Sequence, residues 1–379
     1  MGIPPEAKSF FSEKGLAPAL THQGLIPITC SDILFEYKFS EKGFSLARYA
    51  RIIGWGKYLP EKVLTNQELE RLVNTSDAWI MSRTGIRERR IAADDETASS
   101  MAVRAAKGAL KVAGVEPNSL DLVIAATCTP ELIFPACASL VQHSLGAKNA
   151  AAFDVNAACS GFIYALATAC QFISSGAYNK ILVIGSEVYS RILDWKDRNT
   201  CVLFGDGAGA VVIQAGDSPP GSLSFVLGND GSRANSIYTP GPCGLKKGPY
   251  YITMNGPEVF KFAVNVICLA TKQAVKAAGL DLSDIELIIP HQANTRILKS
   301  AAKALELPPE KVFINVDRYG NTSAASIPIA LCEAVEEGRL KEGDHLVLVG
   351  FGGGLSWAAM VIEWGTGVKN RSPKLSPAI

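Results

Sequence analysis

The chain has 379 residues, of which 48% are hydrophobic and 19% are charged, and its formal net charge is +1. This length is enough for a large buried core in two domains or in one large double unit. The near-neutral charge argues against nucleic acid as a main partner, because nucleic-acid-binding proteins usually carry a clear excess of basic residues. The nine cysteines include no CxxC pair, and the chain has only four histidines. We therefore expect neither a disulfide scaffold nor a zinc site, but reduced thiols in a cytosol-like compartment.

The first 49 residues show weak periodicity and lack the apolar core of a signal peptide. They also contain too many acidic residues for an organelle transit peptide. Residues 1–49 are therefore predicted to form a poorly ordered extension, and residues 366–379 a tail. No run of about 18 uninterrupted apolar residues occurs, so no membrane-spanning segment is predicted and no membrane partner is expected.

Helical periodicity recurs along the rest of the chain, at 98–113, 160–175, 258–278 and 292–305. Short apolar runs typical of strands lie between these helices. They are LDLVIAA at 120–126, KILVIGS at 180–186, AGAVVIQ at 208–214, IELIIP at 285–290 and HLVLVG at 345–350. Strands that are apolar throughout belong to sheets that helices bury on both faces. The sequence thus predicts an α/β fold with a layered α-β-α-β-α architecture.

The chain also repeats part of its own pattern. The segment ALKVAGVEPNSLDLVI at 109–124 aligns without a gap with AVKAAGLDLSDIELII at 274–289, which lies 165 positions later. Each copy contains a helix end, a glycine, a short loop and a buried strand. Two weaker similarities accompany it. FGDGAGAVVI at 204–213 resembles FGGGLSWAAMVI at 351–362, and KILVIGSE at 180–187 resembles HLVLVGFG at 345–352. Repeats in the same order predict a duplicated α/β unit, with a first half over 50–218 and a second half over 219–365.

Cys159 differs from the other cysteines because it lies between the strand pattern AAFDV and a helix that begins near Ser160. A thiol at a helix N-terminus is close to the positive end of the dipole and to free N–H groups, which lower its pKa and favour the thiolate. The same N–H groups can bind an oxyanion. Cys159 is therefore a candidate nucleophile, although a small buried core cysteine would fit the same local pattern.

Two further polar residues lie near predicted element ends. His291 follows the strand IELIIP, and the carboxyl end of a buried strand is where α/β folds place ligands. A structural loop histidine would look the same. Asn321 follows a turn at Gly320 and precedes a predicted helix, so that it or Thr322 could simply cap that helix. Taken singly, neither residue identifies a function.

Six motifs taken together are more specific. They are TSDAWIMSRTGIRERR at 75–90, AACSGF at 157–162, FGDGAGA at 204–210, PHQANTRI at 290–297, GNTSAAS at 320–326 and FGGGLSW at 351–357. In this order they resemble the β-ketoacyl-acyl carrier protein synthase III family of thiolase-like condensing enzymes, and the resemblance extends over nearly all of 50–365. It implies a thiolase-like fold and a homodimer.

The resemblance also implies a two-step reaction. Cys159 would take an acyl group, such as acetyl, from an acyl-CoA thioester, while the N–H groups of Cys159 and Gly353 bind the oxyanion. Malonyl-acyl carrier protein would then lose CO2, and His291 and Asn321 would donate hydrogen bonds to the enolate. Attack of the enolate on the acyl-cysteine gives the 3-oxoacyl product without a metal ion or other cofactor. The His–Asn pair favours the initiating class, because chain-elongating synthases usually have a second histidine there.

Residues for binding coenzyme A follow from the same resemblance. They are Trp79 and Arg83 at the adenine, Arg198 near the phosphates, Gly256 through its backbone and Asn294 at the pantetheine arm. Phe204 is expected to form a wall near the nucleophile. The family often has a polar residue where this chain has Pro257, so a side-chain contact with coenzyme A is not expected there. Phe134 corresponds to the residue that caps the acyl pocket of the partner subunit, and its bulk implies a short acyl primer.

A cationic stripe is predicted on the helix after His291. Arg296, Lys299 and Lys303 fall at i, i+3 and i+7, which places them on one helix face. Acyl carrier proteins are acidic, so this stripe is a candidate docking surface that would steer their encounter. An ordinary solvated helix face would show the same spacing.

Three other functions remain open at this point. A thiolase-fold synthase of secondary metabolism with another starter acyl-CoA would share these motifs. Hydroxymethylglutaryl-CoA synthase shares the fold, but its chemistry requires a glutamate acid/base. The alternative from a different class is a non-catalytic acyl- or CoA-binding module, which the intact set of Cys159, His291 and Asn321 disfavours.

Overall fold

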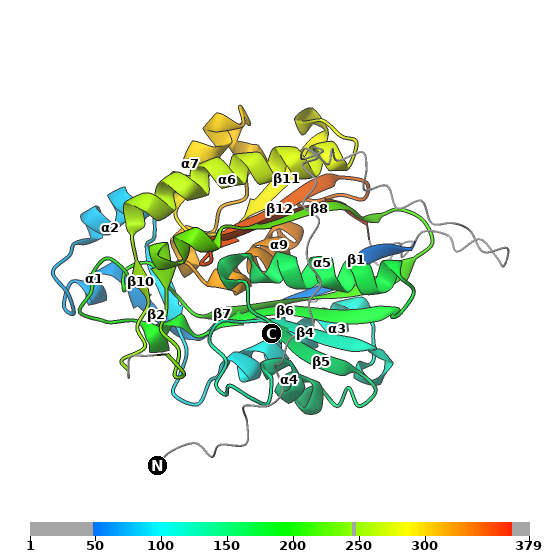
Figure 1. Cartoon of the computed structure of the whole chain (residues 1–379), viewed down its shortest axis with the longest axis horizontal. Helices are drawn as coiled ribbons and strands as arrows, with labels where there is room; N and C mark the ends of the chain where they lie inside the picture. Colours follow the sequence, from blue (N-terminus) through cyan, green and yellow to red (C-terminus); the bar gives the residue numbers. More distant parts are fainter. Residues whose placement is uncertain (1–47, 245–247, 366–379) are drawn as a thin grey trace, which may run out of the picture. The chain divides into compact units, whose positions relative to one another are not determined.

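The computed structural model describes residues 48–244 and 248–365, and these contain two main sheets (Figure 1). The first sheet has five strands in the order β1-β7-β6-β4-β5. These strands are β1 (Tyr49–Tyr58), β4 (Leu122–Ala126), β5 (Ala151–Val155), β6 (Lys180–Glu187) and β7 (Gly207–Gly216). The second sheet has four strands in the order β11-β12-β13-β8. They are β8 (Gly221–Asn229), β11 (Ile285–Pro290), β12 (His345–Gly352) and β13 (Ser356–Glu363).

The two sheets share one topology. In the first, β1 pairs antiparallel with β7, β7 antiparallel with β6, and β6 parallel with β4. In the second, β8 pairs antiparallel with β13, β13 antiparallel with β12, and β12 parallel with β11. Strand β5 extends only the first sheet. The same order and the same directions in both sheets confirm the predicted duplication.

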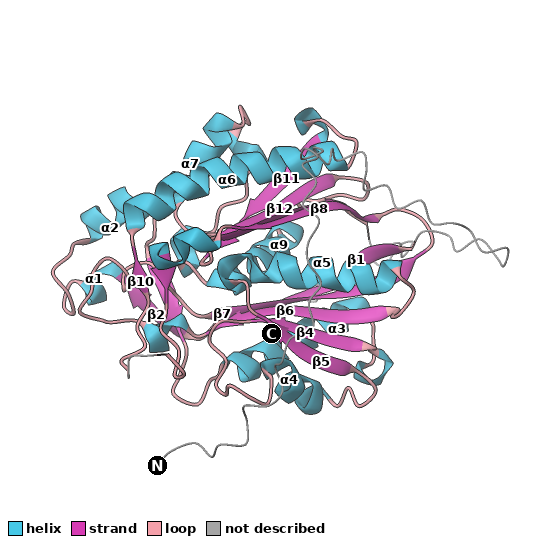
Figure 2. Cartoon of the chain, viewed as in Figure 1, coloured by secondary structure: helices cyan, strands magenta, loops and turns pink. Residues whose placement is uncertain are grey.

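Helices form three layers around the sheets (Figures 1 and 2). Helices α5 (Gly161–Ser174) and α9 (Ser326–Glu336) lie between the sheets and contact both. Helices α3 (Ala98–Ala113) and α4 (Cys137–Leu145) cover the outer face of the first sheet, and α6 (Gly256–Ala277) with α7 (Thr295–Ala304) covers the second. The predicted α/β class and the layered α-β-α-β-α architecture are therefore confirmed.

Smaller elements lie to one side of the layers in Figure 1. They are β2 (Lys62–Thr65), α1 (Asn66–Leu69), α2 (Asp77–Thr84), β3 (Glu88–Ile91), β9 (Ile237–Tyr238), β10 (Thr253–Met254) and α8 (Val316–Tyr319). Strands β2 and β3 pair with each other, as do β9 and β10. Within the described part of the chain, no helix is both long and apolar enough to cross a membrane.

The predicted helices agree with the observed ones, with one informative difference. The pattern at 292–305 predicted a helix from residue 292, but α7 begins only at Thr295. Asn294 caps it, because its side-chain oxygen accepts a hydrogen bond from the Arg296 N–H at 2.8 Å. His291 therefore lies in a loop outside the helix. The extension and tail expected at the termini lie, for residues 1–47 and 366–379, outside the described residues.

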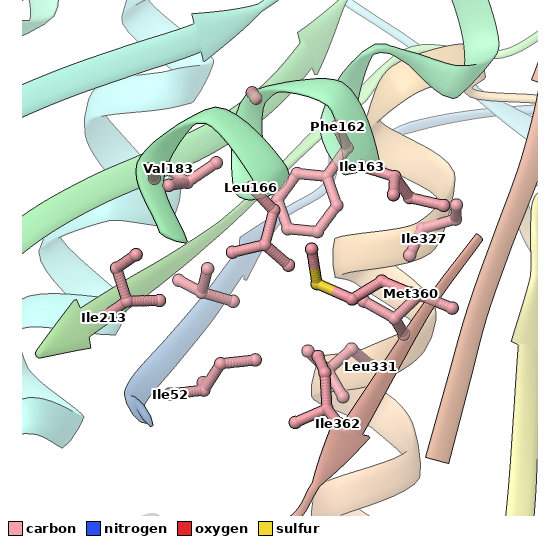
Figure 3. Close-up of a cluster of buried hydrophobic side chains, with 14 of the residues drawn as sticks. Ile52, Phe162, Ile163, Leu166, Val183, Ile213, Ile327, Leu331, Met360 and Ile362 are labelled. Atoms are coloured by element: carbon pink, nitrogen blue, oxygen red, sulfur yellow. The ribbon is translucent and has the colours of Figure 1, made fainter. Parts of the chain in front are cut away.

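The central core surrounds helix α5 (Figure 3). Phe162, Ile163 and Leu166 of this helix are almost fully buried, and they pack among side chains from both sheets. Val183 belongs to the first sheet and Met360 to the second. A helix buried between two sheets is apolar on nearly all sides, and buried residues accordingly occur all around α5. This packing fixes the residues that precede α5.

Close contact between β1 and α3 depends on glycine. A Cβ atom on Gly56 would lie 2.5 Å from the backbone nitrogen of Ala109, and it would also meet the carbonyl oxygen of Ala105. Rigid helix backbone cannot move away, so a methyl group here forces the helix off the sheet. Gly241 is the matched control, because a Cβ atom there meets nothing within 4 Å.

We expect Gly56→Ala to lower the free energy of unfolding by about 1–3 kcal/mol, because it overpacks the α3 contact. Gly241→Ala should change it by less than about 0.5 kcal/mol. Urea denaturation followed by circular dichroism measures both. Equal stability of the two variants would show that the β1–α3 distance can relax.

Candidate active site

The three predicted catalytic residues line one cavity of about 650 Å³. Cys159 comes from the 3₁₀ turn Ala158–Ser160 that leads into α5. His291 directly follows β11, and Asn321 lies in the turn that precedes α9. The first residue belongs to one half of the repeat and the other two belong to the second half. The fold therefore brings together side chains that are up to 162 positions apart in the sequence.

The turn that carries Cys159 has an unusual backbone. Ala158 has φ +47°, in the left-handed region that residues with a Cβ atom rarely adopt. Gly352, at the end of β12, packs directly against this turn. A Cβ atom on Gly352 would lie 2.5 Å from the backbone nitrogen of Cys159. A glycine is therefore required at residue 352 for the two halves to meet at the nucleophile.

The expected lowering of the Cys159 pKa is wrong for the free protein. Burial raises the pKa of this thiol to about 12, and the nearby Glu187 carboxyl raises it further. The Ser323 hydroxyl and the backbone N–H of Cys159 act in the opposite direction, but more weakly than burial. Cys159 is therefore a neutral thiol at rest, and it becomes a nucleophile only if a neighbouring group removes its proton.

His291 is fixed in position and is held neutral. Its backbone N–H donates to the Val349 carbonyl at 2.7 Å. Its ring packs edge-on against the Phe351 ring, with the two ring centres 5.2 Å apart. The ring nitrogen Nδ1 lies 2.7 Å from the Ser326 hydroxyl oxygen, so Nε2 is the free nitrogen of the ring. Burial lowers the pKa of His291 to about 3. The residue is thus a neutral imidazole over the whole physiological range.

Asn321 is held by backbone hydrogen bonds on both sides. Its N–H donates to the Leu203 carbonyl at 2.8 Å, and its carbonyl accepts from the Gly205 N–H at 3.0 Å. Its side-chain oxygen accepts from the Ser323 N–H at 2.8 Å. Because that oxygen is occupied, the amide NH2 group is the part left to donate into the cavity. The Asn321 side chain therefore does two things: its oxygen accepts from the Ser323 N–H, as a helix cap would, and its NH2 group is a hydrogen-bond donor for the cavity.

The residues predicted to bind coenzyme A lie around the same cavity, with one exception. Its lining includes Trp79, Arg83, Phe204, Gly256, Pro257 and Asn294. Arg198 is outside this lining, but its guanidinium lies 5.1 Å from the centre of the Trp79 ring. The guanidinium over the indole in the structure is therefore that of Arg198. The expected clamp, with Trp79 and Arg83 on opposite sides of the adenine, stays a prediction, and both residues line the cavity. The Asn294 amide donates to the Arg83 carbonyl at 3.1 Å, which holds the two segments together.

A second cavity of about 490 Å³ also borders Cys159. Gly353 lines it together with Cys159, as do Tyr164, Tyr189 and Ile252. Phe134 lines neither cavity, because it lies on an exposed loop between β4 and α4. Its side chain is 84% exposed and that of the adjacent Ile133 is 72% exposed. Two large apolar side chains in water, on a loop that lines neither of these two cavities, indicate a contact surface.

Comparisons with known proteins agree on one family. Two family models match, described as 3-oxoacyl-[acyl-carrier-protein] synthase III over residues 153–231 and as its C-terminal part over 275–364. A beta-ketoacyl-[acyl-carrier-protein] synthase III from Symbiobacterium thermophilum is 54% identical over 322 residues, covering 83% of this chain and 98% of that protein. The chain belongs to the 3-oxoacyl-acyl carrier protein synthase III family. It is therefore an acyl-transferring condensing enzyme, as the six motifs predicted.

Further members of the synthase III family match along almost their whole length. The beta-ketoacyl-[acyl-carrier-protein] synthase III from Roseiflexus castenholzii is 52% identical over 330 residues, which are 85% of this chain and 100% of that protein. The crystal structure of 3-oxoacyl-[acyl-carrier-protein] synthase III from Aquifex aeolicus has a TM-score of 0.80 and 49% identity, covering 83% of this chain and 100% of that one. The predicted thiolase-like synthase fold is thus confirmed.

In this synthase the predicted cationic stripe is exposed. Arg296, Lys299 and Lys303 all face solvent on α7, whereas Ile297 and Ala301 are buried against the second sheet. Arg296 also lines the first cavity, and its guanidinium lies 5.4 Å from the centre of the Phe260 ring. The stripe therefore begins at the mouth of the cavity that holds the three predicted catalytic residues.

Sequence reasoning missed three residues of the synthase site. Ser326 supports His291, while Ser323 supports Asn321 and contacts Glu187. Glu187 is fully buried at the end of β6. The rule that pointed to His291, a polar residue at the carboxyl end of an apolar strand, would also have found Glu187. Both serines lie inside the motif GNTSAAS, but nothing in that motif says which side chains they contact.

Proposed function

We propose that this synthase transfers acetyl, or another short acyl group, from coenzyme A to Cys159 and then condenses it with malonyl-acyl carrier protein. The product is a 3-oxoacyl-acyl carrier protein, so the reaction initiates fatty-acid synthesis. The observation that carries the proposal is the convergence of Cys159, His291 and Asn321 on one cavity. A non-catalytic binding module would have no need for a buried thiol, an imidazole and an amide at one point.

In the first step the Cys159 sulfur attacks the thioester carbonyl of the acyl-CoA. Negative charge develops on the carbonyl oxygen, and the N–H groups of Cys159 and Gly353 bind it. The C–S bond to coenzyme A then breaks, and the acyl group remains on Cys159. The second cavity receives the acyl chain, because it borders Cys159 but is lined by neither His291 nor Asn321.

In the second step malonyl-acyl carrier protein occupies the first cavity and loses CO2. The enolate oxygen needs hydrogen-bond donors that do not protonate its carbon. The Asn321 amide is one such donor, since its own oxygen is occupied by Ser323. The Ser326 oxygen accepts the Gln292 N–H at 3.3 Å and its proton is free for His291 Nδ1, which places the ring proton on Nε2. His291 Nε2–H is then the second donor.

Coenzyme A binds along the first cavity, from its mouth to Cys159. The indole of Trp79 with the guanidinium of Arg198 suits the flat adenine ring. Gly256 begins helix α6, so its N–H is among those without a partner inside the helix and can bind an oxygen of the ligand. Pro257 follows in the first turn, where the missing N–H costs the helix nothing. Phe204 forms the wall beside the reacting atoms.

Separate assays of the two half-reactions test this assignment. We expect Cys159→Ala to form no acyl adduct with acetyl-CoA, as measured by intact-protein mass spectrometry. Asn321→Ala should still form the adduct at a similar rate, but should lose condensation with malonyl-acyl carrier protein by about 100-fold or more, because one enolate donor is missing. An acyl adduct on the alanine variant, or normal condensation without Asn321, would contradict the assigned roles.

We further propose that two copies form a homodimer in which Phe134 caps the partner's acyl pocket. Its exposure, next to Ile133, supports this arrangement because a pair of large apolar side chains gains about 3–6 kcal/mol from burial. In this position the Phe134 ring limits the length of the acyl chain.

Replacing this ring should lengthen the accepted chain. We expect Phe134→Ala to raise kcat/KM for hexanoyl-CoA relative to acetyl-CoA by about tenfold or more, since each added methylene becomes worth about 0.8 kcal/mol of burial. Initial rates with a panel of acyl-CoA primers measure this ratio. Ile133→Ala on the same loop is the matched control, and it should change the ratio much less. An unchanged ratio in the Phe134 variant would exclude it from the acyl pocket.

We also propose that Arg296, Lys299 and Lys303 bind the acidic carrier protein. Their exposure on one helix face beside the cavity mouth supports this, since charge complementarity speeds encounter. The free cysteines of the described residues are compatible with a cytoplasmic enzyme.

Reversing the charge of this stripe separates carrier-protein binding from chemistry. In the triple variant to Glu we expect a rise in KM for malonyl-acyl carrier protein of about tenfold or more at low salt, because attraction becomes repulsion. Self-acylation by acetyl-CoA should stay within about twofold when Lys299 and Lys303 alone are changed. Steady-state kinetics and mass spectrometry provide the two measurements. Equal losses in both would place the fault in the fold or in coenzyme A binding.

A further inference from the structure

The proposed reaction leaves one proton without a destination. Cys159 rests as a thiol, and the acyl group can bind its sulfur only after the S–H bond breaks. His291 is a poor proton acceptor because burial lowers its pKa to about 3. The other predicted catalytic residue, Asn321, has an amide side chain that is not basic. A base near the sulfur, other than the three predicted catalytic residues, would give this proton a destination.

Glu187 is the candidate, and it is deeply buried. Its side chain is fully buried at the carboxyl end of β6. One carboxylate oxygen accepts from the Cys128 N–H at 3.0 Å and from the Thr129 hydroxyl at 2.7 Å. The other accepts from the Ser323 hydroxyl at 3.0 Å. Among the described residues no cation pairs with this carboxyl group, so burial favours its protonated form while the donated hydrogen bonds favour the carboxylate.

Ser323 connects this carboxyl group to the active site. Its φ is +50°, so its backbone is held in the left-handed region despite its Cβ atom. Its N–H donates to the side-chain oxygen of Asn321, and its hydroxyl donates to Glu187 at 3.0 Å and lies 3.2 Å from the Tyr189 hydroxyl. The same hydroxyl is the side-chain partner that lowers the pKa of the Cys159 thiol. The strained conformation therefore places one hydroxyl between a nucleophile and a carboxylate.

We propose that Glu187 accepts the proton of the Cys159 thiol through the Ser323 hydroxyl during acylation, and returns it to the same sulfur during condensation. This inference rests on the proposed role of Cys159 as acyl carrier. Glu187 acts through Ser323 and touches neither substrate.

The steps balance in protons and electrons. In acylation the Cys159 proton moves to the Ser323 oxygen while the Ser323 proton moves to the Glu187 carboxylate, and the sulfur forms its bond to the acyl carbon. The coenzyme A sulfur leaves with the electron pair of the broken C–S bond and takes a proton from water. In condensation the enolate carbon displaces the Cys159 sulfur, which leaves as a thiolate. Glu187 then returns its proton through Ser323, and both groups are restored.

The surroundings of Glu187 suit this exchange. The titratable groups that face it are Cys128 after β4, Cys137 at the start of α4, Tyr189 in the turn after β6, and Cys159 itself. All four are acids that are neutral when protonated, so none supplies a positive charge that would hold the carboxylate ionised. Burial raises the pKa of Glu187 to about 7, against about 3 for His291. Glu187 is thus the stronger base of the two by roughly four pK units.

The test follows acylation of Cys159 by acetyl-CoA with rapid quenching and mass spectrometry between pH 5 and 10. In the wild-type enzyme the rate should rise with pH while Glu187 loses its proton and level off above about pH 8. In Glu187→Gln the rate should fall about 100-fold at pH 7.5, the lower range for loss of a general base, and should keep rising with pH without a plateau. Glu333→Gln is the control for loss of another buried carboxyl group. It should keep the wild-type pH profile even if it is less stable.

Two further variants keep the test decisive if Glu187→Gln folds poorly. Ser323→Ala should give the same loss and the same missing plateau, and the double variant should be no slower than either single one. Thr129→Val removes one hydrogen bond to the carboxylate, so its plateau should begin at higher pH. An infrared difference spectrum of acylation should show a newly protonated carboxyl group in the wild type and none in Glu187→Gln.

The outcomes distinguish this inference from the proposed function. If the wild type forms no adduct on Cys159, the proposed function itself fails. If it does, but Glu187→Gln acylates at the wild-type rate with the wild-type pH profile, the relay is overturned and the acyl-carrier role of Cys159 stands. Multiplying losses in the double variant would likewise overturn the relay.

Discussion

The site depends on the backbone contact between the turn that carries Cys159 and the glycines at the end of β12. Gly350 lies against Ser160, and Gly352 lies against Cys159 itself, where a Cβ atom would be within 3.4 Å of the turn in both cases. This contact places the nucleophile of the first half beside the loops of the second half, which supply His291 and Asn321. It also places the turn at Gly353 next to the sulfur. A larger residue at 350 or 352 would separate the two halves at the point where the chemistry occurs.

Burial, more than helix geometry, controls the ionisation of the nucleophile. The favourable effect of a helix N-terminus on an anion is about 0.3–1 kcal/mol, and up to about 2 kcal/mol in buried sites. The rise in the thiol pKa from 9.0 to about 12 corresponds to about 4 kcal/mol in the opposite direction. In the free enzyme, desolvation of the Cys159 thiol therefore outweighs the effect of the helix N-terminus on its pKa. The same desolvation keeps His291 neutral, with a ring N–H that can donate a hydrogen bond. Burial therefore accounts both for the neutral imidazole of His291 and for the neutral thiol of Cys159.

The layered fold was predictable from sequence because its elements are marked locally, whereas the three converging residues were predictable only through the six motifs taken together. Continuous apolar strands indicate buried sheets, and a 165-residue offset between repeats indicates duplication. The contacts among side chains were not predictable in the same way. That Arg198 lies over Trp79 depends on how two distant segments pack. That Ser323 lies beside Glu187, 136 positions away, depends on how α9 is inserted between the sheets.

The duplication also explains the strained backbone on both sides of the reacting sulfur. Ala158 and Ser323 are separated by the same 165 positions as the sequence repeat, and both have φ near +50°. Each begins a 3₁₀ turn of three residues, and a central helix starts directly after each turn, α5 at Gly161 and α9 at Ser326. Ser323 is thus the counterpart of the residue before the nucleophile. One turn geometry, present in both halves, presents a thiol from the first half and a hydroxyl with an amide from the second. The left-handed residues persist because the buried helices that follow them fix the turns from one side.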